Sequence, residues 1–170
     1  MRQFILRASA WEIFAFLLGV PALFAIALSY VPRIELILVG TLVYGAGVFY
    51  WLWAIASESN QELSEQNRRS TRLMAVGLWY ALAYITAFLL FITVSPEAHI
   101  PSAIIAPHVL AMLAIFYSLW FAASQLTAIC NGGSRPYWPT LGRFFLFWYS
   151  PIGVWFIQPV VRRHLGAVSA

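Results

Sequence analysis

Four long apolar segments constrain the fold of this chain more than any other feature. They cover residues 11–30, 36–56, 73–94 and 104–126. Each has about the length, roughly 20 residues, that an α-helix needs to cross the hydrocarbon core of a bilayer. Inside a bilayer the backbone polar groups find no water, and a helix satisfies them internally. The sequence therefore predicts an all-α integral membrane protein with four transmembrane helices.

The composition and the charges agree with this prediction. Of the 170 residues, 62% are hydrophobic and 9% are charged, whereas soluble domains carry about 25% charged residues. The net charge of +4 comes from Arg and Glu alone and is spread over several short loops. This distribution suits contact with membrane lipids, and it lacks the continuous basic stripe that nucleic-acid binding requires.

Two stretches of the chain repeat each other. Residues 49–58 read FYWLWAIASE, and residues 116–125 read FYSLWFAASQ. A match in register suggests an internal duplication, here of two tandem helical hairpins that cover about 11–58 and 79–125. The alternative is that aromatic-rich membrane helices resemble one another by composition. The predicted organisation is a four-helix transmembrane bundle over residues 1–126, followed by a tail.

The arginine residues predict the orientation in the membrane. Short loops rich in Arg face the cytoplasm. Such residues lie before the first segment, between the second and third, and after the fourth, namely Arg2, Arg7, Arg68, Arg69, Arg72, Arg135 and Arg143. The connections on the other side hold only Arg33. We therefore expect a multi-pass protein of the bacterial inner (plasma) membrane with a cytoplasmic N-terminus. The cluster at residues 68–72 opposes the dipole of the helix that follows it, so it is interpreted as an orientation signal.

The tail, residues 127–170, begins with a turn and continues with an aromatic stretch at 144–160. Ser150-Pro151 and Gly153 interrupt this stretch near its centre, and if it crossed the membrane the arginines that follow would lie outside. A re-entrant or interfacial segment on the cytoplasmic side is therefore favoured, and a fifth span is the alternative. The string Pro-Ile-Gly-x-Trp-x-x-Gln-Pro at 151–159 resembles the tail of uncharacterised small bacterial multi-pass membrane proteins. That resemblance covers the tail alone and implies no activity.

Large aromatic side chains are the first group of candidate site residues. Membrane helices associate by close packing, and aromatic side chains often carry the energy of an interface. Five residues are predicted to contact lipid or a partner, namely Trp148, Trp155, Phe156, Trp53 and Trp120.

The polar ends of the two repeats are the second group. Ser57 and Glu58 in one copy correspond to Ser124 and Gln125 in the other. If the hairpins pack around a pseudo-two-fold axis, these four residues meet on the cytoplasmic side and form a polar site between the repeats. The alternative is two helix ends that simply meet water.

His108 is the candidate cofactor ligand. Histidine can hold haem in a membrane helix, and His99 lies nine residues earlier in the sequence. A haem needs ligands from opposite faces, whereas these two lie on one connection and the helix that follows it. No metal or cofactor is therefore expected, and haem or quinone at His108 is the alternative.

The favoured function is a small non-catalytic membrane subunit or scaffold. It would pack against another membrane protein or a second copy of itself, with lipid or quinone held between the hairpins. The sequence contains no nucleotide-binding loop and no zinc-protease or hydrolase motif. The alternatives are an electron-transfer subunit with haem or quinone near His108, and an oligomeric small transporter or channel. The latter is weakened because the apolar segments contain no Asp, Lys or Arg.

Overall fold

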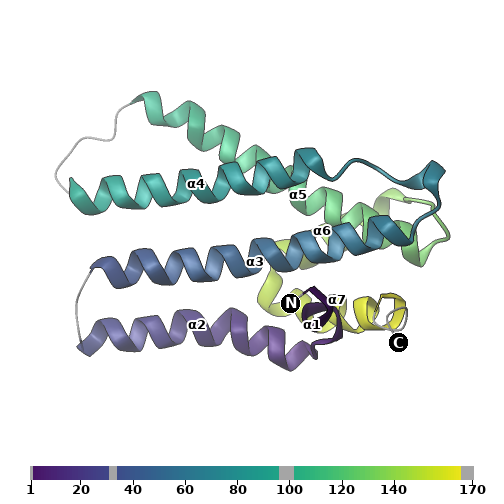
Figure 1. Cartoon of the computed structure of the whole chain (residues 1–170), viewed down its shortest axis with the longest axis horizontal. Helices are drawn as coiled ribbons and strands as arrows, with labels where there is room; N and C mark the ends of the chain where they lie inside the picture. The colour runs from purple at the N-terminus through teal and green to yellow at the C-terminus, as the bar shows by residue number, and fades with distance from the viewer. Residues whose placement is uncertain (1, 31–33, 96–101, 166–170) are drawn as a thin grey trace.

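The computed structural model describes residues 2–30, 34–95 and 102–165, and this part of the chain is helical with no strand. In chain order the elements are α1 (Arg2–Arg7), α2 (Ala10–Tyr30), α3 (Ile34–Glu62), the 3₁₀ helix η1 (Glu65–Asn67), α4 (Arg72–Val94), η2 (Ser102–Ile104), α5 (Ile105–Cys130), α6 (Tyr137–Trp148) and α7 (Ser150–His164) (Figure 1). Helices α2, α3, α4 and α5 are each long and apolar enough to cross a membrane. The predictions of an all-α class and of four such helices are therefore confirmed.

Helix α2 begins at a capping box. The hydroxyl of Ser9 accepts a hydrogen bond from the backbone N–H of Glu12 at 3.2 Å. In return, Oε2 of Glu12 accepts from the backbone N–H of Ser9 at 2.6 Å and from its hydroxyl at 2.9 Å. These reciprocal bonds satisfy N–H groups that have no partner inside the first turn of a helix.

Helix α3 continues beyond the apolar segment that predicted it. It has 29 residues, which corresponds to about 43 Å at the usual rise per residue, whereas the hydrocarbon core measures about 30 Å. Gln158 bonds both Trp51 and the carbonyl of Ala8, so α2 begins beside Trp51. The residues of α3 after Trp51 therefore project about 16 Å beyond the start of α2.

Arg68 explains how the extended end of α3 is stabilised. Its Nε donates to the carbonyl of Leu63 at 2.9 Å, and its Nη2 donates to the carbonyl of Gln61 at 2.8 Å. A cation at the C-terminal end of a helix satisfies free carbonyls and interacts favourably with the helix dipole. The interpretation of residues 68–72 as an orientation signal alone was therefore incomplete, because Arg68 folds back onto the preceding helix.

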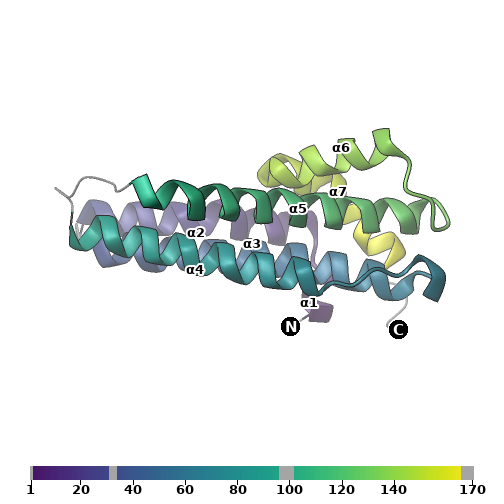
Figure 2. The same cartoon turned by 90° about the horizontal axis from the view of Figure 1, so that it is seen from above.

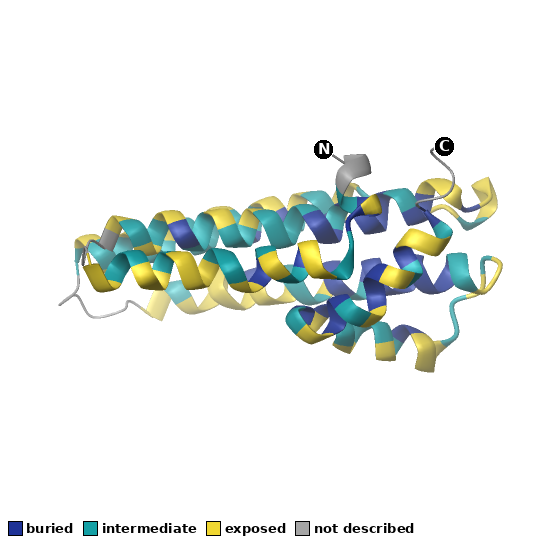
Figure 3. Cartoon of the chain, turned by 90° about the horizontal axis from the view of Figure 1, so that it is seen from below, coloured by how far each residue is buried: buried dark blue, intermediate teal, exposed yellow. Residues whose placement is uncertain are grey.

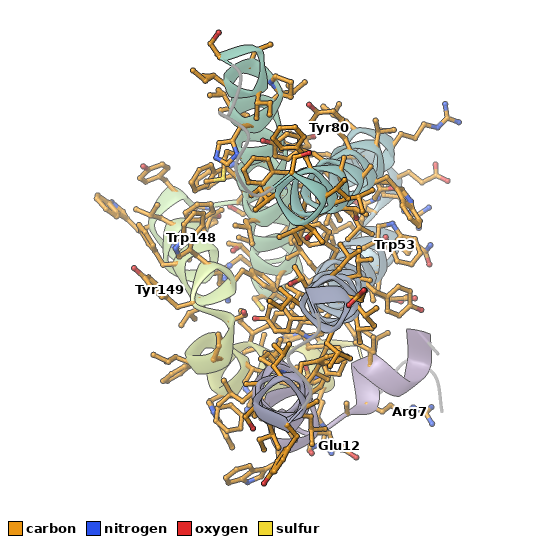
Figure 4. All side chains as sticks on the ribbon, turned by 90° about the vertical axis from the view of Figure 1, so that its left-hand side faces the viewer. Arg7, Glu12, Trp53, Tyr80, Trp148 and Tyr149 are labelled. Atoms are coloured by element: carbon orange, nitrogen blue, oxygen red, sulfur yellow. The ribbon has the colours of Figure 1, made fainter. Side chains whose placement is uncertain are left out.

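The helices pack around α3. It contacts α2, α4 and α5, and α4 also packs on α5. Helix α2 makes little direct contact with α5, and the tail helices link them along one side of the molecule: α2 packs on α7, α7 on α6, and α6 on α5 (Figures 2 and 4). The tail helices thus pack on the same core as the long helices. The predicted boundary at residue 126 stays a prediction.

The buried side chains concentrate at the end of the molecule where the tail helices lie (Figure 3). Ile55 and Leu126 are fully inaccessible there, as is Val154 of α7. The other half of the long helices exposes apolar side chains such as Leu23 and Ile105. Exposure of this kind is expected where helices face lipid tails.

The tail folds into two short helices with a sharp bend at Tyr149 between them. They have 12 and 15 residues, and each is shorter than the roughly 20 residues that a membrane span requires. Gly153 permits the bend, because the carbonyl group of Leu146 occupies the place where a Cβ atom would stand. The break lies where the Ser-Pro and Gly residues predicted it, and a re-entrant or interfacial placement stays a prediction.

Candidate functional site

An apolar groove of about 820 Å³ runs along one face of α3, between α2 and α4. Its floor includes Ala46 and Gly47 of α3, and its walls include Phe16 of α2 and Leu82 of α4. The volume lies within the range of about 300–1,000 Å³ that is usual for small-molecule sites. It is therefore large enough to hold a ligand rather than a single water molecule.

Small side chains on α3 explain the shape of this groove. The ring of Phe16 lies so close to Gly47 that a Cβ atom there would overlap it, and α2 approaches α3 closely at this point. Ala46 is exposed and too small to fill the space beside it. Helices α2 and α4 make little direct contact with each other, so the groove between them stays open next to Ala46 and Gly47.

The groove has one charged end. It extends along α3 from Val43 to Trp53, which is about 15 Å at the usual helical rise and about half of the hydrocarbon core. Ile5 of α1 and Glu12 of α2 line the end near Trp53. Among the described lining residues, Glu12 alone carries a formal charge at neutral pH.

The predicted aromatic residues of α7 and α6 have different surroundings. The ring centroids of Trp155 and Trp11 lie 4.6 Å apart, and those of Trp155 and Phe14 lie 5.2 Å apart, so Trp155 packs within the chain. Trp148 stacks on Phe116 at 4.5 Å and is 39% exposed. Phe156 is 60% exposed and is the most accessible of the three.

The other two predicted tryptophans lie on different helices. Trp53 is half-buried and lines the groove, and Trp120 is half-buried with its ring 5.9 Å from that of Tyr137. The sequence prediction omitted Trp138, which is 76% exposed and is the second residue of α6, directly after Tyr137. An adjacent Tyr-Trp pair directly after a Gly-rich turn was the signal that could have identified it.

The predicted polar site between the repeats lies at the packed end of the molecule. Ser57, Ser124 and Gln125 are buried, and Glu58 is half-buried. The hydroxyl of Ser124 donates to the carbonyl of Phe121 in its own helix at 2.8 Å, whereas the hydroxyl of Ser57 has no hydrogen-bond partner among the described residues. The corresponding serines thus differ in their bonding, and a shared site stays a prediction.

Arg135 contacts the predicted polar site, and the sequence did not indicate this contact. Its Nη2 donates to the side-chain oxygen of Gln125 at 3.1 Å and to the carbonyl of Asn67 at 2.6 Å. Burial, and secondly the charge of Arg69, lowers the pKa of Arg135 from its ordinary value. A guanidinium nevertheless stays charged at neutral pH, so Arg135 fixes the turn after α5 to the connection between α3 and α4.

His108 lies at the other end of the molecule, in the first turns of α5. Its Nδ1 is 3.1 Å from the hydroxyl of Tyr84 on α4. His99 lies outside the described residues. His164 is the last residue of α7, and α7 lies at the packed end of the molecule (Figure 1). In the described part of the chain no group of three or more His, Cys, Asp and Glu residues could hold a metal ion. Cofactor binding by His108 stays a prediction.

Gln158 of α7 is a structural residue whose role the sequence did not reveal. It is fully buried. Its Nε2 donates to the carbonyls of Ile5 at 2.8 Å and Ala8 at 2.9 Å, and its Oε1 accepts from the indole N–H of Trp51 at 3.3 Å. Because Ile5 and Trp51 both line the groove, Gln158 holds one end of the groove in shape.

Comparison of the chain with known protein families, with curated proteins and with solved structures finds no match.

Proposed function

We propose that this protein is a small non-catalytic membrane subunit that holds one lipid chain in the groove between α2 and α4. The groove itself carries the proposal, because its lining is apolar apart from one end. It is formed by helices that are apolar enough to cross a membrane, so its opening in a bilayer would face lipid chains. Its length of about half the hydrocarbon core suits a single chain from one leaflet.

The proposal includes an orientation. We place the N-terminus, the connection between α3 and α4, and both ends of the α6–α7 hairpin on the cytoplasmic side of a bacterial inner membrane. The distribution of Arg supports this orientation. The exposed rings of Phe145, Tyr149 and Phe156 on the short tail helices suit the level of the lipid headgroups.

Reporter fusions test the orientation. A reporter fused after Arg72 and another fused after Ala170 are both expected to give a cytoplasmic signal, whereas a control fusion after Val94 is expected to give an external one. The physical reason is that an even number of spans separates the first two points from the N-terminus. An external signal from the fusion after Ala170 would mean that the tail crosses the membrane.

A groove-filling substitution tests the function. The change Ala46→Phe places a ring in the groove, and we expect it to remove most of the lipid that stays bound after mild delipidation. Native mass spectrometry of the detergent-solubilised protein counts these lipids. Ala25→Phe is the matched control, because Ala25 is exposed on α2 and does not line the groove. Equal lipid retention by Ala46→Phe and the wild type would contradict the proposal.

A second candidate function is docking to another membrane protein or to a second copy of the chain. The observation that favours it is the exposed aromatic surface of the tail, where Trp138 and Phe156 are 76% and 60% exposed. The mass of the complex in the same spectra reports a second copy. The electron-transfer alternative gains less support, because Tyr84 is the polar partner of His108 and the other described histidine, His164, is the last residue of α7 and not of a helix that packs beside His108.

A further inference from the structure

The charged end of the groove contains an anion held in a fixed position. Glu12 projects from α2 and Trp53 from α3, with α1 beside them (Figure 4). Oε2 of Glu12 accepts two hydrogen bonds from Ser9, at 2.6 Å and 2.9 Å. The carboxylate is therefore oriented before any ligand arrives, which lowers the ordering cost of binding.

The carboxylate of Glu12 can accept further hydrogen bonds from a ligand. This carboxylate is exposed, and a carboxylate offers about four acceptor sites on two oxygens, of which Ser9 uses two. Within residues 5–30, 35–95 and 102–165 no cation forms an ion pair with it, although the charge of Arg162 on α7 reaches it. One end of an apolar groove thus presents a negative charge, with a positive charge in its neighbourhood.

We propose that Glu12 makes the groove select a zwitterionic phospholipid with a primary ammonium in its headgroup, such as phosphatidylethanolamine, over an anionic one such as phosphatidylglycerol. This inference rests on the proposed lipid-binding function. An ammonium donates up to three hydrogen bonds and forms charge-assisted ones with a carboxylate. A headgroup with a phosphate and no cation brings a like charge to Glu12, and such repulsion contributes to specificity.

The change Glu12→Gln tests this selection without disturbing the helix start. Gln is accepted at this position of a capping box, so the substitution removes the charge and keeps the cap. The protein is incubated with equimolar phosphatidylethanolamine and phosphatidylglycerol, and native mass spectrometry counts both retained lipids. The wild type is expected to retain the zwitterionic lipid about two- to fivefold better, as for an exposed ion pair. Glu12→Gln is expected to retain the two lipids in a ratio near one.

Glu65→Gln is the matched control, because Glu65 is exposed on η1 and does not line the groove. It is expected to keep the wild-type ratio. The inference is wrong if Glu12→Gln keeps that ratio as well, or if the wild type shows no preference or prefers the anionic lipid. These outcomes concern the ratio of the two retained lipids. A failure of the proposed function would appear differently, as an unchanged total amount of bound lipid in Ala46→Phe.

Discussion

Gln158→Leu is expected to lower the free energy of unfolding by about 3–5 kcal/mol, because it leaves several buried polar groups without a partner. The carbonyls of Ile5 and Ala8 and the indole N–H of Trp51 all bond this side chain. Leu cannot replace any of these bonds. The same change separates α7 from the segment that precedes α2, so loss of the packed end is expected at a lower temperature or denaturant concentration.

Unfolding of the detergent-solubilised protein, followed by tryptophan fluorescence, measures this effect. Gln66→Leu is the control, because Gln66 is exposed on η1. An exposed substitution of this kind usually changes stability by less than about 0.5 kcal/mol. If the two variants unfold at the same denaturant concentration, the hydrogen bonds of Gln158 do not stabilise the core.

Gly153→Ala is expected to have the second large effect, a destabilisation of about 3 kcal/mol or more, because it overpacks a site that cannot expand. The added methyl group would overlap the backbone carbonyl of Leu146, and a backbone group cannot move aside as a side-chain end can. The bend between α6 and α7 must open to accept it. Limited proteolysis near Tyr149 and the thermal midpoint together measure this opening.

Gly142→Ala is the matched control in the same hairpin. Apart from its chain neighbours and the backbone of its own helix, no described heavy atom lies within 4 Å of the place that its Cβ would occupy, and the change removes a glycine from the interior of α6. A gain of about 0.5–1 kcal/mol is therefore expected from helix propensity. Wild-type protease resistance and melting of Gly153→Ala would show that the tail does not bend here.

The sequence predicted the helices better than it predicted their ends. An apolar run indicates where a chain lies in lipid, but a helix continues wherever its backbone groups stay satisfied. The second segment was expected to end at residue 56, and α3 continues to Glu62, where Arg68 donates to the carbonyls of Gln61 and Leu63. A local signal did succeed where it specifies backbone geometry, at the break between α6 and α7 beside Gly153.

The site was harder to predict, because a groove depends on pairs of helices that make little direct contact. This groove lies where α2 and α4 both pack on α3 and make little contact with each other, and no spacing in the sequence indicates this. The sequence identified Trp155 as a large ring but could not tell that it packs within the chain, and it omitted the exposed ring of Trp138. Gln158 acts on residues that lie 150 and 153 positions away in the chain.

The hydrogen bonds between α7 and the segment before α2 have a consequence for biosynthesis. Ribosomes add about 5–20 residues per second, so α1 and α2 are made several seconds before α7. During this interval the surface of α2 that packs on α7 lacks its neighbour while the other long helices are made. Final assembly of the packed end therefore waits for α7, and until then this surface of α2 is accessible to chaperones, to proteases and to exchange of segments between nascent chains.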